Sequence, residues 1–237
     1  MPKPKPTHLP VVAILVGGLG TRLQPVTGGD QKVIAPVGGR PFLFQLLDQI
    51  ADAGLRDVVL CTSYRADQVA EAIGDQYRSL RLHYSYEAVP LGTAGALRNA
   101  LPLIESDPVL AMNGDSYCEL NFELFREFHA RTEACGSLVV CEVEETIAGG
   151  RVEFDAQSAI TGFTEKSALP SRGWINAGVY VLGHELLRSI PEAQPVSLER
   201  EIFPGWVGRG LHAFPVSGNF IDIGTPKSFA AAQHLFV

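Results

Sequence analysis

The stretch Leu9-Pro-Val-Val-Ala-Ile-Leu-Val16, followed at once by Gly17-Gly18-Leu19-Gly20-Thr21-Arg22-Leu23, decides the fold of this chain. A short run that is apolar at successive positions predicts a central parallel strand covered on both faces. A glycine-rich loop directly after such a strand lies at the carboxyl end of the sheet, where α/β proteins bind ligands. The opening residues therefore predict an α/β sheet with a ligand loop at its first strand.

The glycine loop has the chemistry of an anion site. Glycines let backbone N–H groups converge on phosphate oxygens, and Arg22 adds a planar set of donors. Two familiar phosphate loops are excluded by the residues themselves. A dinucleotide fingerprint that starts at Gly18 requires glycine at position 23, which is Leu23, and no Gly-Lys-Ser/Thr triplet follows. A tight turn that uses glycine for geometry alone is the competing interpretation.

Strand and helix patterns alternate through the first half of the chain. Apolar periodicity, β-rich runs and turn residues predict these elements in order. This alternation predicts right-handed βαβ units and a doubly wound, largely parallel sheet. The expected elements are a helix at 41–53, a strand at 57–62, a helix at 66–73, a strand at 80–87, a helix at 93–101 and a strand at 108–113.

The second half changes character. After a helix at 122–129, strand patterns crowd together, which predicts a mixed or antiparallel extension of the same sheet. The fold class is therefore α/β with a doubly wound, mostly parallel, Rossmann-like central sheet and such an extension. We expect a flexible tail at 1–8 and a single domain at 9–237, with halves at about 9–116 and 117–237. The later elements are strands at 137–143, 151–154, 160–164, 174–182 and 219–223, and a final helix at 225–236.

Composition excludes several classes of protein. The chain has 237 residues, 46% of them hydrophobic and 19% charged, which excludes disordered and fibrous proteins. A net charge of −7 argues against nucleic acid and anionic membranes as partners. No run of eighteen apolar residues predicts a membrane span, and the four cysteines lack a zinc spacing, so we expect reduced thiols and a cytoplasmic protein. No pattern indicates an oligomeric state.

Motifs along nearly the whole chain resemble those of the sugar-1-phosphate nucleotidyltransferases. Within that family, the combination of Asn-Gly-Asp-Ser, Ile-Asn-Ala-Gly and the Ser-Leu-Glu segment is most similar to the D-glycero-α-D-manno-heptose 1-phosphate guanylyltransferases. One departure is that Gln31 precedes Lys32 where the family usually has proline. The motifs are the glycine loop at 17–23, Gln31-Lys32, Glu87-x-x-Pro-Leu-Gly-Thr-Ala-Gly95, Asn113-Gly-Asp115-Ser, Thr164-Glu165-Lys166, Ile175-Asn176-Ala-Gly178, Ser197-Leu-Glu199-x-Glu201-Ile-Phe-Pro204 and Phe220-Ile-Asp222-Ile-Gly-Thr-Pro226.

The resemblance implies condensation of a nucleoside triphosphate, GTP favoured, with a sugar 1-phosphate, giving a nucleotide sugar and pyrophosphate. The nucleophile is an anionic phosphate oxygen, so the chemistry needs charge neutralisation and in-line positioning rather than a general base. Mg²⁺ is the implied cofactor, with Asp115 and Asp222 as its ligands. For a lone aspartate beside glycine, a turn or cap is the alternative role. Surface polysaccharide synthesis is the implied context.

The same resemblance assigns the other site residues. Arg22 and Lys32 are the expected catalytic cations, which would hold the β- and γ-phosphates. Guanine's N1 and N2 hydrogens require an acceptor, either the Glu87 carboxylate or a backbone carbonyl. The expected nucleotide-binding residues are Val16, Gly17, Gly18, Gly20, Thr21, Glu87, Leu91, Gly92, Thr93 and Asn113, and the expected sugar-phosphate residues are Glu165, Lys166, Asn176 and Gly178.

Other functions remain open at this point. One is transfer to mannose 1-phosphate, or a uridylyl or thymidylyl transfer to another sugar 1-phosphate. A second, of a different class, is a non-catalytic regulatory protein that binds nucleotide sugars, although the five expected charged site residues are all present. A third is a glycosyltransferase, which usually holds its metal through Asp-x-Asp, and this chain contains no such triplet.

Overall fold

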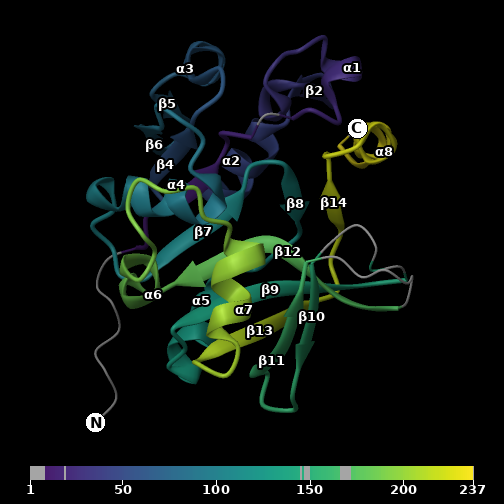
Figure 1. Ribbon diagram of the computed structural model, residues 1–237. Helices are drawn as coiled ribbons and strands as arrows, with labels where there is room; N and C mark the ends of the chain where they lie inside the picture. The colour runs from purple at the N-terminus through teal and green to yellow at the C-terminus, as the bar shows by residue number, and fades with distance from the viewer. Residues whose placement is uncertain (1–8, 19, 145, 147–149, 166–171, 237) are drawn as a thin grey trace.

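The computed structural model describes residues 9–18, 20–144, 146, 150–165 and 172–236. Its centre is a ten-stranded mixed sheet in which β11, β10, β12, β7, β1, β4, β6 and β5 follow one another, while β9 and β13 join at β12 (Figure 1). Four neighbouring strands are parallel: β7 (Val109–Asn113), β1 (Val12–Leu15), β4 (Asp57–Thr62) and β6 (Leu80–Tyr86). Their carboxyl ends therefore meet at one edge, as the alternation of strands and helices predicts.

The extension of the sheet is mixed. β9 (Gly136–Val143) and β10 (Arg151–Phe154) pair antiparallel with β12 (Gly173–Leu182), and β11 (Ile160–Thr164) pairs antiparallel with β10. β12 also pairs antiparallel with β7, so it joins the extension to the parallel strands. The expected fold class is confirmed, and β13 (Leu211–Val216), which runs parallel to β9, is a strand that the sequence patterns missed.

Helices cover both faces of the sheet, and strand β1 shows why. Successive side chains of a strand point to opposite faces. Val12 and Ile14 pack in one core cluster with residues of α2, whereas Ala13 packs in a second cluster with residues of α4. The helices are α1 (Gln24–Thr27), α2 (Leu43–Asp52), α3 (Ala66–Ile73), α4 (Gly92–Ala100), α5 (Phe122–Thr132), α6 (His184–Arg188), α7 (Phe203–Trp206) and α8 (Pro226–Leu235), with 3₁₀ turns at Lys32–Ile34 and Leu101–Leu103 and a π-helical turn at Leu198–Ile202.

Short strands complete the fold and correct one expectation. Pro41 lies in a small hairpin rather than in the first turn of α2, which begins at Leu43. The Asn-Gly-Asp-Ser motif continues into a strand that pairs with the strand carrying Asp222, a contact between segments more than a hundred residues apart. These short strands are β2 (Pro36–Val37), β3 (Arg40–Pro41), β5 (Gln76–Tyr77), β8 (Ser116–Cys118) and β14 (Phe220–Asp222).

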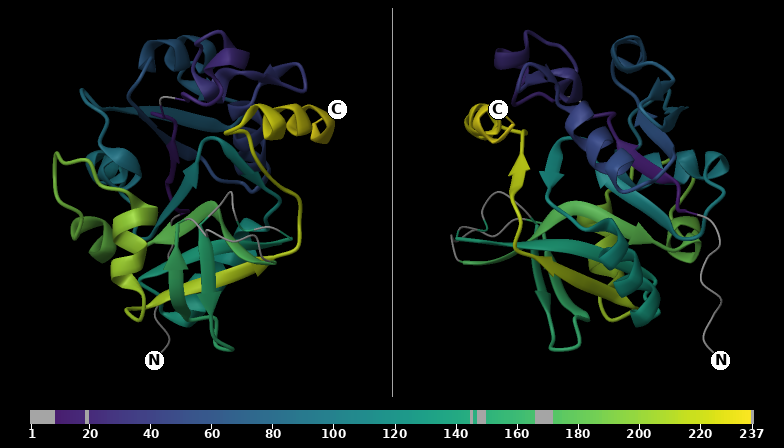
Figure 2. Two further views of the ribbon diagram at one scale, coloured as in Figure 1. Left: turned by 45° about the vertical axis from the view of Figure 1, so that its right-hand side comes forward. Right: turned by 180° about the vertical axis from the view of Figure 1, so that it is seen from behind.

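The C-terminal helix α8 packs beside the β2–β3 hairpin, which follows Lys32 in the sequence (Figures 1 and 2). The Gln233 side chain donates to the Pro36 carbonyl at 2.8 Å and accepts from the Gly38 N–H at 3.2 Å. Thr225 and Ser228 form a capping box at the N-terminus of α8, directly after β14. The helix thereby links the segment after Lys32 to the segment after Asp222.

None of the helices in the described part of the chain is long and apolar enough to cross a membrane.

Candidate active site

The carboxyl ends of β1, β4 and β7 surround a cavity of about 250 Å³. Of the residues expected from sequence to bind nucleotide, phosphate or metal, nine line it: Val16, Gly17, Gly18, Lys32, Glu87, Gly92, Thr93, Asn113 and Asp115. These residues come from five separate segments of the chain. Their convergence agrees with the placement of a ligand site at this edge of an α/β sheet.

The glycine loop lies close to its neighbours at two points. A Cβ atom on Gly17 would lie 3.0 Å from the Ser63 Cβ, in the loop after β4. Gly20 has a φ of +59°, and a Cβ there would approach the Lys32 Cβ to 3.4 Å. Glycine thus avoids a tight contact with Ser63 at the first position and allows a left-handed backbone at the second. The loop is packed against the segment that carries Lys32.

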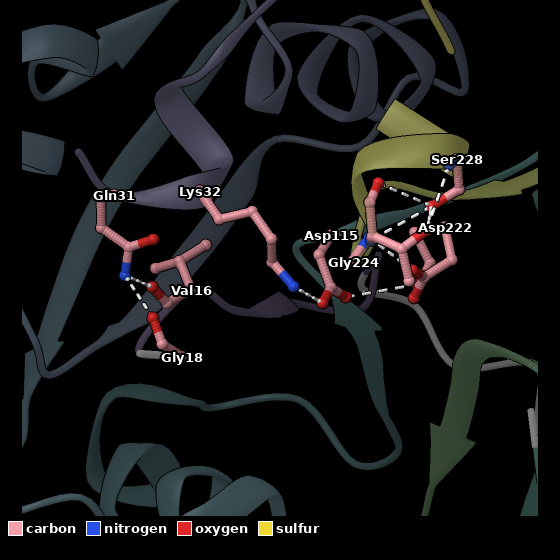
Figure 3. A network of polar contacts seen from close by, with 10 residues as sticks. Val16, Gly18, Gln31, Lys32, Asp115, Asp222, Gly224 and Ser228 are labelled. Carbon is pink, nitrogen blue, oxygen red and sulfur yellow. Dashed lines mark hydrogen bonds and ion pairs between the residues drawn. The ribbon is translucent and has the colours of Figure 1, made fainter. Parts of the chain in front are cut away.

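Lys32 and Asp115 line the cavity, and Asp222 lies beside Asp115 outside the lining (Figure 3). The Lys32 ammonium forms an ion pair with Asp115, and the two side chains are only 12% and 28% exposed. The Ser116 hydroxyl lies 3.4 Å from a carboxylate oxygen of Asp115 and 3.4 Å from one of Asp222. The pairing of β8 with β14 sets this arrangement, because Ser116 lies opposite Asp222 in the ladder.

The electrostatics of Asp222 favour a nearby cation. Burial raises the pKa of the Asp222 carboxyl, and the negative charge of Asp115 raises it further, while Lys32, the Gly224 N–H and Arg22 oppose the shift. Arg22 lies near, since a Cβ on Gly224 would be 3.2 Å from its Nη2. Two crowded carboxylates are relieved by a positive charge between them. Carboxylate oxygens are also the donors that Mg²⁺ prefers, so Asp115 and Asp222 fit a magnesium ion.

Glu87 also lines the cavity, close to the glycine loop. Its carboxylate accepts the Leu91 N–H at 2.8 Å, and a Cβ on Gly17 would lie 3.5 Å from its Oε1. Burial raises the pKa of Glu87, and the bond from Leu91 partly offsets that rise. The Glu87 carboxylate is therefore a hydrogen-bond acceptor beside the cavity, and a further donor from a ligand would stabilise its charged form.

The Gly92 turn is held by the Ser-Leu-Glu segment. The Val196 carbonyl accepts N–H groups of Ala94 at 3.0 Å and Gly95 at 3.3 Å. The Thr93 hydroxyl donates to Glu199 at 2.8 Å and accepts the Leu198 N–H at 2.8 Å. The Thr93 hydroxyl thus both donates and accepts a hydrogen bond within the protein. Thr93 therefore lines the cavity and also holds the Gly92 turn against the Ser-Leu-Glu segment.

Asn113 connects the cavity to the sugar-side motif. Its Oδ1 is buried and has no hydrogen-bond partner within the described residues, so it offers an acceptor to a ligand. Gly178 has a φ of +75°, and a Cβ there would lie 2.9 Å from the Asn113 Nδ2. The Asn176 side chain donates to the Tyr180 hydroxyl at 2.8 Å and accepts the Gly178 N–H at 3.0 Å, so it shapes this turn.

Several expected site residues do not line this cavity, among them Gly20, Arg22, Asn176, Gly178 and Asp222. Glu165 pairs at 3.7 Å with Arg200, and Lys166 is outside the described residues. Thr21 is exposed, and Leu91 lines a neighbouring hollow together with Glu87. Sequence reasoning assigned no role to several residues that do line the cavity: Leu15, Gln31, Val33, Cys61, Pro90 and Ala96. For Gln31 the signal was present, because it replaces the usual proline.

Within the described residues no group of three or more histidine, cysteine, aspartate or glutamate side chains is arranged to hold a metal. The candidate metal ligands are thus the pair Asp115 and Asp222, which leaves the remaining positions of a magnesium ion to phosphate oxygens and water.

The chain belongs to the nucleotidyl transferase family, whose model matches residues 11–236. Among its relatives, mannose-1-phosphate guanylyltransferase catalytic subunit beta of Drosophila melanogaster is 36% identical over 94% of this chain. Mannose-1-phosphate guanylyltransferase of Mycobacterium tuberculosis is 34% identical over the same share. The chain spans 62% and 63% of the lengths of these two relatives.

A solved structure gives the same fold over the full length. HddC from Yersinia pseudotuberculosis superposes with a TM-score of 0.87 at 32% identity, covering 97% of this chain and 100% of that one. HddC complexed with GMP-PN superposes with a TM-score of 0.84 at 31% identity over the same shares of the two chains.

Proposed function

We propose that this protein transfers a guanylyl group from GTP to a sugar 1-phosphate, giving a GDP-sugar and pyrophosphate. The observation that carries the proposal is that Lys32, Asp115 and Glu87 line one cavity, while Asp222 and Arg22 lie close to this Lys32–Asp115 pair without lining the cavity. Such a site, with cations, paired carboxylates and a separate carboxylate acceptor, suits a ligand that has both phosphates and a base with N–H donors. The relatives named mannose-1-phosphate guanylyltransferase and the neighbour solved with GMP-PN support guanine as that base.

In the proposed reaction an oxygen of the sugar 1-phosphate attacks the α-phosphorus of GTP. A new O–P bond forms, and the bond between the α-phosphorus and the bridging oxygen to the β-phosphorus breaks, so that pyrophosphate leaves with the electron pair. Asp115 and Asp222 would hold Mg²⁺, which would neutralise phosphate charge. Lys32 and Arg22 supply fixed positive charge for the departing pyrophosphate, a role that needs no proton transfer.

Lys32 changes partner in this scheme. In the structure its ammonium pairs with Asp115. A bound Mg²⁺ would give Asp115 a second counterion, and the Lys32 ammonium would then be free to donate to a phosphate oxygen. The ion pair thus keeps the Lys32 side chain extended into the cavity before the substrate binds.

Guanine recognition is proposed to use Glu87. Its carboxylate accepts a backbone N–H at 2.8 Å and retains acceptor capacity for the N1 and N2 hydrogens of guanine. A base without those donors would leave the half-buried carboxylate unmatched, which disfavours it by about tenfold or more.

For the sugar, D-glycero-α-D-manno-heptose 1-phosphate is the favoured substrate, on the combination of the Asn113, Asn176 and Ser197 motifs. Mannose 1-phosphate is the second candidate, favoured by the names of the relatives. The two sugars differ by one exocyclic hydroxymethyl unit, so discrimination depends on a polar contact to the extra hydroxyl. A nucleotide sugar of this kind would serve surface polysaccharide synthesis.

The test is a matrix of GTP, ATP, UTP and dTTP against heptose, mannose and glucose 1-phosphates, scored by pyrophosphate release with Mg²⁺. We expect release with GTP and a manno-configured sugar phosphate. Asp115→Asn serves as the inactive control. A preference for UTP or dTTP would overturn the guanylyl assignment, whereas nucleotide-sugar binding with no release for any pair would favour the non-catalytic regulatory protein.

A further inference from the structure

Gln31 occupies the position where proline usually precedes the lysine of this family, and its side chain is buried inside the site. The residue is 1% exposed and lines the cavity next to Lys32. Its amide nitrogen donates to three backbone carbonyls: Val16 at 2.7 Å, Gly18 at 3.1 Å and Tyr64 at 3.3 Å. Figure 3 shows the nitrogen turned toward Val16 and Gly18. Proline has no side-chain donor, so it cannot make these bonds.

The three carbonyls belong to segments that must be held together. Val16 directly follows the first strand, Gly18 lies in the glycine loop, and Tyr64 lies in the loop after β4. Carbonyl oxygens that converge on one point repel each other and repel a phosphate, unless a donor lies between them. The Gln31 amide has two hydrogens, so it joins the three oxygens by sharing one of them.

Holding these carbonyls also fixes the donors that face a ligand. The carbonyl of Val16 and the N–H of Gly17 belong to one planar trans peptide, so fixing the first fixes the direction of the second. Gly17 lines the cavity. On its main-chain side, the Gln31 carbonyl accepts the Ile34 N–H at 3.1 Å and starts the turn that carries Lys32. One residue therefore connects the glycine loop to the base of Lys32.

We infer that Gln31 is a positioning residue that holds the glycine loop in its triphosphate-binding shape through its side-chain amide. This inference rests on the proposed function, because it requires a nucleoside triphosphate in the cavity. The Gln31 amide would hold the glycine loop by hydrogen bonds that a proline at this position could not donate.

The experiment measures GTP and GMP binding by calorimetry, with Mg²⁺ and without sugar phosphate. Gln31→Met keeps length and removes the donors, Gln31→Glu also adds a charge, and Gln31→Asn keeps a shorter amide. Gln45→Met is the matched control, since the buried Gln45 amide donates to the Val37 carbonyl away from the cavity. We expect Gln31→Met to weaken GTP binding about tenfold, in line with the loss of one net hydrogen bond.

Further outcomes separate positioning from folding. GTP affinity should fall in the order wild type, Asn, Met, Glu, and GMP affinity should fall less, because the loop is inferred to hold the outer phosphates. In steady state the Gln31→Met variant should raise the KM for GTP while the KM for sugar phosphate stays within about twofold. The control should bind like wild type.

Equal affinity of Gln31→Met and wild type for GTP would overturn the inference. So would equal losses for GTP and GMP that follow a fall in Tm, because they would show a purely structural role. Failure of the wild-type protein to bind GTP at all would instead overturn the proposed function.

Discussion

Replacing Gly92 with alanine is expected to damage both the stability of the protein and its nucleotide site. Gly92 begins α4 and lines the cavity, and its φ of +70° lies in the left-handed region. A Cβ at this position would lie 2.5 Å from the Val196 carbonyl oxygen, which is backbone and cannot rotate away. The substitution therefore forces the Gly92 turn and the Val196 segment apart.

The magnitude follows from two contributions. A left-handed backbone costs alanine about 1–2 kcal/mol. The Val196 carbonyl accepts N–H groups from Ala94 and Gly95, and each of these bonds contributes about 0.5–1.5 kcal/mol. With both bonds weakened, we expect the free energy of unfolding to fall by about 2–4 kcal/mol. At about 2–4 °C per kcal/mol for a chain of this size, Tm should fall by roughly 5–15 °C.

Gly54→Ala is the matched control. Gly54 has a φ of +75° at the end of α2, and a Cβ there would have nothing within 4 Å. It should cost only the backbone contribution of about 1–2 kcal/mol and leave GTP binding unchanged. Urea unfolding and GTP calorimetry on both variants give the comparison. If Gly92→Ala loses no more stability than Gly54→Ala, the argument from the Val196 contact is refuted.

Three further predictions concern the charged residues. Asp222→Asn should lower pyrophosphate release by orders of magnitude, whereas Tm at pH 7 should stay the same or rise. The substitution removes a carboxylate whose pKa is raised by burial and by Asp115, and it keeps an oxygen that accepts the Gly224 N–H. Normal turnover would exclude Asp222 from the site. Lys32→Ala should mainly raise the KM for GTP and Lys166→Ala mainly the KM for sugar phosphate, and equal effects on both substrates would contradict that division. Because burial raises the pKa of Glu87 above its unfolded value, its stabilising contribution is present at low pH and lost as pH rises through the folded pKa. The Glu87→Gln variant should therefore have a higher Tm than wild type at pH 8, and this difference should vanish below about pH 4. The variant should also bind GTP more weakly. An unchanged GTP affinity would exclude Glu87 from base recognition.

Much of the fold could be predicted from sequence because its signals are local. The run from Val12 to Leu15 is apolar at every position, and a strand with such a pattern must be covered on both faces. Glycine after that strand, and aspartate after the strand ending at Asn113, place the ligand site at the carboxyl edge wherever the helices pack. Most of the expected nucleotide residues accordingly line the cavity.

The tertiary structure alone decided which distant segments meet. β13 was missed because its partner β9 lies some seventy residues earlier, and pairing direction leaves no mark in a six-residue pattern. Similarly, the Thr93 hydroxyl donates one hydrogen bond to, and accepts another from, a segment about a hundred residues away. The roles of the metal ligands and of Lys166 stay predictions from motif resemblance.

Gln31 shows the physical reason for this division most clearly. In the sequence it is a polar residue where proline is usual, and hydropathy gives no reason to bury it. Its burial is tolerated because three carbonyls from separate segments satisfy its amide, and a buried donor is stable only when such partners exist. Periodicity, which depends on neighbours along the chain, determined the elements, whereas hydrogen-bond partners, which depend on neighbours in space, were decided only by the folded structure.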